Sequence, residues 1–206
     1  MRSRFTTMRN LLLLTVLTSI LLTVGCEGTV SPEPEDRPAS TVARDTFEAE
    51  PPQYVIRQNR FYGLVQGELI TDAGDRLKRA TRNDGEGAYT IYRILGDDGE
   101  DIGYVVPSVA DASRIGDIHV TARTAATEGD IRVGHTYARL RIAYPALEVR
   151  GADTEGRTFA YTKNKAFRLA DFTSRDTDID EGSVPPETKI SEIVVIDRAT
   201  GQALEI

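Results

Sequence analysis

Alternation of apolar and polar residues dominates the chain beyond residue 53. Runs with period two, broken by Gly, Asp and Asn, are typical of half-buried strands, because successive side chains of a strand point to opposite faces. In residues 117–125, Ile118 and Val120 would point inward and Arg123 outward. We expect strands at residues 61–70, 88–95, 101–106, 117–125, 136–143, 147–150, 157–162, 190–196 and 202–206.

Short Gly- and Asp-rich segments between these runs predict hairpins, because both residues adopt the positive φ that tight turns need. The clearest is Gly96-Asp97-Asp98-Gly99. The last hairpin would tie down the C-terminus. The expected hairpins join residues 88–95 to 101–106, 147–150 to 157–162, and 190–196 to 202–206.

Helix signals are few. Residues 108–115 have Ser108 as a possible N-cap and Gly116 as a stop. Residues 165–172 would bury Phe167 as a second short helix, and residues 73–82 read equally well as a third helix or as a charged loop.

About ten short antiparallel strands with one to three short helices predict a mainly β fold, either a small barrel or a sandwich. The order of expected elements in residues 118–161 is similar to an OB-fold, which stays one alternative. We expect one β domain at residues 53–206, with two small β units split near residues 107–116 as the other reading.

The N-terminus has the pattern of an export signal. Arg2, Arg4 and Arg9 precede an apolar run at residues 11–22, which is too short to cross a bilayer core of about 30 Å as a helix. The only cysteine, Cys26, follows.

Residues 22–26, Leu-Thr-Val-Gly-Cys, resemble the lipobox of bacterial lipoproteins, although Thr23 stands where that family favours leucine. The resemblance implies cleavage before Cys26 and a lipid on its sulfur, so that residues 1–25 are a signal peptide. Glu27 as the next residue favours the outer membrane where there is one. Residues 26–52 are rich in Pro and Glu and would be a disordered, lipidated tether.

Composition narrows the possible partners. The chain has a net charge of −7, and loss of the three leader arginines leaves about −10, which argues against nucleic acid because phosphate binding relies on clustered positive charge. The anchor, not the domain, would then contact the lipid bilayer.

Residues 176–187 are the sharpest metal candidate. Calcium takes six to eight oxygen ligands, and Asp176, Asp178, Asp180 and Glu187 fall at the first, third, fifth and twelfth places of an EF-hand-like spacing. Glu181 occupies the sixth place, where the turn favours glycine. A solvated acidic loop is the other reading.

Arginines suggest a second site. Arg123, Arg139 and Arg141 would share an outward face if residues 117–125 and 136–143 are strands. Such a face would bind an anionic ligand or the acidic patch of a partner. The alternative is that these arginines pair with neighbouring carboxylates.

Catalytic signals are weak. His119 and His135 lack the close spacing on one element that marks a zinc site, and no serine stands in a nucleophile motif. We therefore expect a non-enzymatic, lipid-anchored domain in the cell envelope that binds a ligand or a protein partner, with no cofactor except, as an alternative, calcium. A calcium-dependent structural or adhesive domain and an unrecognised hydrolase are the other readings.

Overall fold

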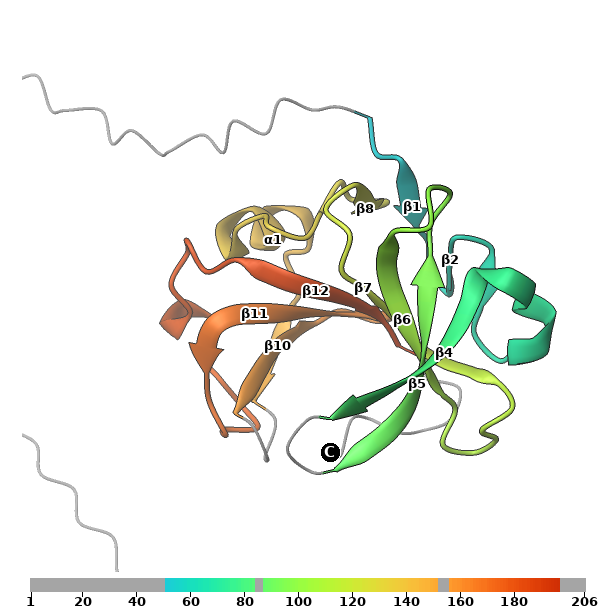
Figure 1. Ribbon diagram of the computed structural model, residues 1–206. Helices are drawn as coiled ribbons and strands as arrows, with labels where there is room; N and C mark the ends of the chain where they lie inside the picture. Colours follow the sequence, from blue (N-terminus) through green and yellow to red (C-terminus); the bar gives the residue numbers. More distant parts are fainter. Residues whose placement is uncertain (1–50, 84–86, 152–155, 197–206) are drawn as a thin grey trace, which may run out of the picture. The chain divides into compact units, whose positions relative to one another are not determined.

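The computed structural model describes residues 51–83, 87–151 and 156–196 (Figure 1). The signal-like and lipobox residues 1–26, most of the expected tether and the expected strand 202–206 lie outside the described residues. Within the described part, no helix has both the length and the apolar character needed to cross a membrane.

Residues 51–83, 87–151 and 156–196 contain twelve strands, one α-helix and two 3-10 turns. The elements are β1 (Tyr54–Ile56), β2 (Arg60–Phe61), β3 (Leu64–Val65), η1 (Ile70–Arg76), β4 (Leu77–Asn83), β5 (Ala88–Leu95), β6 (Asp101–Pro107), β7 (Ile115–Val120), β8 (Ala125–Thr127), α1 (Tyr137–Ala143), β9 (Glu148–Gly151), β10 (Arg157–Tyr161), β11 (Lys165–Thr173), η2 (Glu181–Ser183) and β12 (Ile190–Val195).

Eight strands form one antiparallel sheet in the order β4-β5-β6-β7-β12-β11-β10-β9. Among the described residues, β4 and β9 are edges that do not pair with each other, so the sheet is not closed into a barrel. Two small pairs accompany it, the parallel pair β1-β8 and the antiparallel pair β2-β3. The expected mainly β, antiparallel fold is confirmed, and the barrel is the alternative that the sheet does not adopt.

The main hydrophobic core lies on one face of this sheet, which we call the core face. A smaller apolar cluster, Ala166, Val194 and Ile196, lies on the opposite face. Phe61, Ile118, Tyr137, Phe167 and Ile193 are all buried in the main core, and they come from β2, β7, α1, β11 and β12. Figure 1 shows α1, β1 and β8 together on one side of β7 and β12. Because β6 pairs directly with β7, residues 107–116 connect two neighbouring strands of the same sheet.

Two of the expected hairpins are confirmed. β5 and β6 pair antiparallel around residues 96–100, and β9 and β10 pair antiparallel around residues 152–156. The third involves residues outside the described part. β12 itself already pairs with β11 along one edge and with β7 along the other.

Residues 61–70 are not one strand. Tyr62 and Gly63 both have positive φ, 50° and 72°, which is the backbone of the two-residue turn that joins twisted antiparallel strands. β2 and β3 therefore form a very small hairpin, and η1 follows. The charged residues 73–82, expected as a helix or a loop, instead end η1 and form most of β4, which is paired along its length with β5.

In two segments the predicted strand is a helix, or the predicted helix is a strand. Residues 136–143 form α1 because Thr136 caps the helix, its hydroxyl accepting a hydrogen bond from the Arg139 amide at 3.3 Å. Tyr137 and Leu140, three residues apart, supply the buried stripe. An apolar spacing of two fitted the same residues, which misled the prediction. The OB-like reading of residues 118–161 required a strand where α1 stands.

The opposite error concerns residues 165–172, which belong to β11. This strand is paired on both sides, with β10 and β12, and buries Phe167 and Leu169 while Arg168 points to the other face. Tertiary pairing outweighs the helix propensity of its Ala, Leu and Lys residues. The expected helix at residues 108–115 is a loop with Val109 80% exposed, so it has no apolar stripe to bury.

Candidate ligand-binding face

The face of the eight-stranded sheet turned away from the core, here the outer face, carries a polar cluster on its central strands. We call it the sheet-face cluster. Register places Tyr104 opposite His119 and Arg168 opposite Glu192. Its members are Arg82 on β4, Tyr104 on β6, His119 on β7, Arg168 on β11 and Glu192 on β12.

Glu192 is the centre of the cluster. Its residue is only 5% exposed, although it lies on the face away from the core. The Tyr104 hydroxyl donates to Glu192 Oε1 at 2.6 Å, and His119 Nδ1 lies 2.5 Å from the same oxygen. Arg168 approaches Oε2 to 3.7 Å, an ion-pair distance that is too long for a hydrogen bond.

These contacts keep Glu192 ionised. Burial alone would raise the pKa of its carboxyl, but the hydrogen bonds from His119 and Tyr104 and the charge of Arg82 outweigh burial and lower the pKa to about 2. The pKa of Tyr104 moves the other way, because burial and the adjacent Glu192 carboxylate both disfavour a phenolate. Tyr104 therefore stays a hydrogen-bond donor.

Planar groups stack in this cluster. The rings of Tyr104 and His119 are nearly parallel, with centroids 4.3 Å apart and 10° between their planes. The guanidinium carbon of Arg82 lies 4.5 Å from the centroid of the Tyr104 ring, a cation–π distance. Gly103 permits the close approach of β6 and β7 here, because a Cβ on it would lie 2.1 Å from the His119 carbonyl oxygen.

The arginines of the outer face differ in their acceptors. Arg93 makes a two-pronged ion pair with Asp101, so its donors are used. Arg82 is half-buried, and in the described part of the chain its guanidinium makes no hydrogen bond or ion pair, only the contact with Tyr104. Its N–H edges are therefore left for a ligand.

His119 is fixed within this cluster through one ring nitrogen. Its Nδ1 is held by Glu192, and Nε2 is the ring nitrogen turned away from that contact. Nucleophilic catalysis needs a hydroxyl or thiol in contact with the histidine. Within residues 51–83, 87–151 and 156–196, the polar side-chain contact of His119 is with Glu192, and no serine or threonine hydroxyl touches its ring.

The four acidic residues predicted as calcium ligands are not brought together. The Asp176 carbonyl accepts from the Gly151 amide of β9 at 2.7 Å, and Asp180 caps η2, its carboxylate accepting from the Gly182 amide at 3.1 Å. Asp178 and Glu187 are exposed. In the described ranges, no three His, Cys, Asp or Glu side chains converge as metal ligands.

The predicted arginine face depended on a strand at residues 136–143, and α1 replaces that strand. Arg139 and Arg141 lie two residues apart on α1, where side chains do not face the same way. Arg123 is exposed in the turn between β7 and β8. The structure therefore does not present the three arginines on one face.

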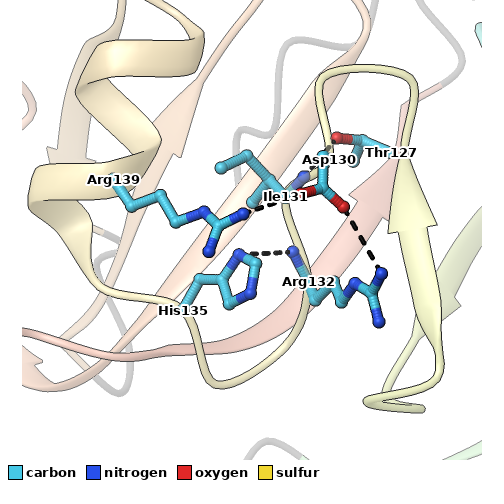
Figure 2. A network of polar contacts seen from close by, with 6 residues as sticks. All are labelled: Thr127, Asp130, Ile131, Arg132, His135 and Arg139. Carbon is cyan, nitrogen blue, oxygen red and sulfur yellow. Dashed lines mark hydrogen bonds and ion pairs between the residues drawn. The ribbon is translucent and has the colours of Figure 1, made fainter. Parts of the chain in front are cut away.

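Carboxylates bind both helical arginines. Asp130 has a positive φ of 53°, and its carboxylate lies 2.7 Å from Arg139 and 3.5 Å from Arg132 (Figure 2). The buried His135 accepts from the Arg132 amide at 3.2 Å through Nδ1. Arg141 lies 3.6 Å from Glu181. These contacts give Arg139 and Arg141 a structural role.

Two surface hollows lie away from the sheet-face cluster. One, of about 490 Å³, is bounded by α1 and residues 182–186 and includes Arg141 and the 84% exposed Ile142. The other, of about 360 Å³, lies between residues 147–150 and 177–181 and includes Asp178.

Sequence reasoning named one member of the cluster, His119, and only as a histidine without the spacing of a zinc site. It missed Glu192, Tyr104 and the two cluster arginines because they come together from residues up to 110 positions apart. One local signal was present. Glu192 stands in the mostly apolar run Ile190 to Ile196, in which Ser191 is the other polar residue, and a carboxylate at such a position needs partners.

Comparison with known proteins adds one structural likeness and no function. No protein-family model matches the chain, and the search of curated proteins finds no match. Among solved structures, the chain is similar to the uncharacterized protein yfeY from Escherichia coli, with a TM-score of 0.46 and 14% sequence identity. The likeness covers 68% of this chain and 98% of that chain.

Proposed function

We propose that this protein is a lipid-anchored, extracytoplasmic binding protein, held in the cell envelope through Cys26 and binding a ligand or an envelope partner through the outer face of its sheet. The anchor rests on the lipobox-like residues 22–26 and the signal-like residues before them. The binding role rests on the sheet-face cluster.

One observation carries the binding role. Glu192 is almost fully buried and ionised on a face that does not contribute to the main core. A buried ion pair adds little stability compared with apolar residues of the same size. Two arginines, a stacked tyrosine and a histidine around one carboxylate are therefore better explained by recognition than by folding.

The anchor is tested on the mature protein. Mass spectrometry of the chain purified from membranes is expected to show an N-terminus at Cys26 that carries a diacylglycerol, and a Cys26→Ser variant is expected to keep its leader. An unmodified Cys26, or an intact Met1, overturns the anchor.

The binding role is tested by gentle crosslinking in intact cells, followed by purification of the full chain. A ligand or partner bound at the outer face should be recovered with wild type and lost with Arg82→Gln combined with Arg168→Gln. Arg79→Gln is the matched control, because Arg79 lies on β4 three residues from Arg82, is exposed and points to the other face. Equal recovery with the double variant and the control contradicts the proposal.

A further inference from the structure

We propose that the sheet-face cluster binds an oxyanion, the carboxylate or phosphate group of its ligand, at the N–H edge of Arg82. This rests on the proposed binding function and adds the chemical class of what is bound. It departs from the arginine site expected at Arg123, Arg139 and Arg141, because it uses other arginines on another surface.

Charge favours an anion. The cluster contains two guanidinium groups, Arg82 and Arg168, and one carboxylate, Glu192, so its arginines outnumber its carboxylate. The chain as a whole has a net charge of −7. A local positive surplus on an acidic protein attracts an anion to that one place, whereas the rest of the acidic surface repels the anion on average.

Unused donors favour an oxyanion in particular. The Tyr104 ring covers one face of the Arg82 guanidinium and leaves its N–H edges, which match the paired oxygens of carboxylate and phosphate. Arg168 stands 3.7 Å from Glu192 without a hydrogen bond to it, so its N–H groups are also available. By contrast, Arg93 on the same face donates to both carboxylate oxygens of Asp101, so this arginine already has its acceptor.

The geometry suits one group of atoms with two or more oxygens. β4 and β7 lie on opposite sides of β6, so Arg82 and His119 flank the Tyr104 ring from two sides, 4.5 Å and 4.3 Å from its centroid. The Tyr104 ring lies between Arg82 and His119, so the two oxygens of one oxyanion meet the N–H fork of Arg82, at about 2.7–2.9 Å, and His119 reports the binding across the ring. Glu192 contacts His119 through Nδ1 at 2.5 Å, so the imidazole is held beside Tyr104 and its signals respond to changes at this stack.

Histidine-selective NMR on the full chain in detergent micelles tests this inference, because the protein has only His119 and His135. Inorganic phosphate, glycerol phosphate and acetate are titrated at constant ionic strength with chloride as the balancing salt. His119 signals should shift saturably, and those of the buried His135 should not. A stronger response to glycerol phosphate than to phosphate points to a lipid headgroup, and the reverse points to a free anion.

Variants of Arg82 test whether the anion binds at this arginine. Arg82→Gln should raise the Kd by about tenfold or more, as expected for loss of a charged hydrogen bond, and Arg79→Gln should leave it unchanged. The His135 signals and a thermal melt report whether Arg82→Gln is folded. Where it is not, Arg82→Lys, which keeps the charge and loses the fork, should still weaken binding.

Two outcomes overturn the inference: no saturable His119 shift with any of the three anions, or an equal shift in the Arg82 variants. Neither outcome removes the proposed function if crosslinking still recovers a partner that needs the cluster. Conversely, anion binding without any ligand or partner in the crosslinking experiment supports this site and contradicts the proposed function.

Discussion

The two faces of the eight-stranded sheet are made by the same strands and are held together by different physics. On the core face, Phe167 and Ile193 are completely buried among apolar neighbours. On the outer face, beside a small apolar cluster around Val194, the adjacent residues Arg168 and Glu192 join a network in which stability depends on charge and hydrogen-bond geometry. Apolar packing tolerates changes in pH and salt, whereas a buried carboxylate with specific partners does not.

The largest expected effect lies on the core face. Phe167→Ala should lower the free energy of unfolding by about 3–5 kcal/mol, because the ring is fully buried and packs against Tyr144 with centroids 5.4 Å apart. Urea denaturation measures the loss, which should be nearly the same at pH 4 and pH 7. A loss below 1 kcal/mol, of the order expected for a surface position, would contradict the assignment of this face as the core.

The outer face should show the opposite pH behaviour. The folded-state pKa of Glu192 is about 2, below its ordinary value of 4.5, so its contribution is complete above about pH 4.5 and is lost as the pH falls through about 2. The contribution amounts to about 3 kcal/mol. Urea denaturation of wild type and Glu192→Gln should give a difference that is large at pH 7 and shrinks towards pH 2. A difference independent of pH would show that the Glu192 charge is not stabilised.

A smaller loss of stability is expected where β6 and β7, which carry Tyr104 and His119, come close together. Gly103→Ala should destabilise the protein by about 1–3 kcal/mol, because the added Cβ meets the His119 carbonyl and forces β6 and β7 apart. The same change should disturb the Tyr104–His119 stack, which the His119 NMR signals report. A stable variant with unchanged His119 signals would show that β6 and β7 have more freedom than the structure indicates. Gly99→Ala, at a position with open space but positive φ, is a control for backbone strain alone.

Exposed ion pairs away from the sheet should contribute less. Asp130→Asn removes the charge that pairs with Arg139 and keeps a residue that tolerates positive φ, so we expect a loss of only about 0.5 kcal/mol, measured by urea denaturation. Asp130→Ala should lose about 1 kcal/mol more through backbone strain. Equal losses for both variants would show that the ion pair, not the turn, matters.

The smallest expected effect concerns calcium. Thermal melts of the full chain with calcium and with a chelator should give the same Tm, because Asp176, Asp178, Asp180 and Glu187 do not converge. A higher Tm in calcium would restore residues 176–187 as a metal site. Asp178→Asn, at an exposed carboxylate, should then abolish the shift.

Period-two alternation predicted β5, β6, β7, β9, β10 and β12 correctly, because each of these strands contributes apolar side chains to the core and is bounded by a turn. The pattern failed where two periods fitted the same residues, as in α1, where the Thr136 cap decides, and in β11, where pairing on both sides decides. The charged β4 gave no apolar signal, since an edge strand has little to bury.

The candidate site was less accessible to sequence reasoning than the fold. Its residues are 15 to 110 positions apart in the chain. They meet only because the strand order places β6, β7, β12 and β11 side by side. The predicted metal and arginine sites relied on residues close in sequence. In the structure such residues mainly stabilise the backbone, as Asp180 does by capping η2 and Asp176 by contacting β9.

Under the proposed lipid anchor, the two edges of the open sheet have a consequence for how neighbouring copies meet. Beyond β9, residues 176–179 occupy the edge, with the Ile179 amide donating to the Val149 carbonyl at 3.0 Å. The edge strand β4 instead carries Lys78, Arg79 and Arg82, and charged side chains discourage a second chain from adding a strand. Molecules held by a lipid meet one another far more often than molecules in solution. Like charges along β4 would then keep neighbouring copies from fusing their sheets into aggregates.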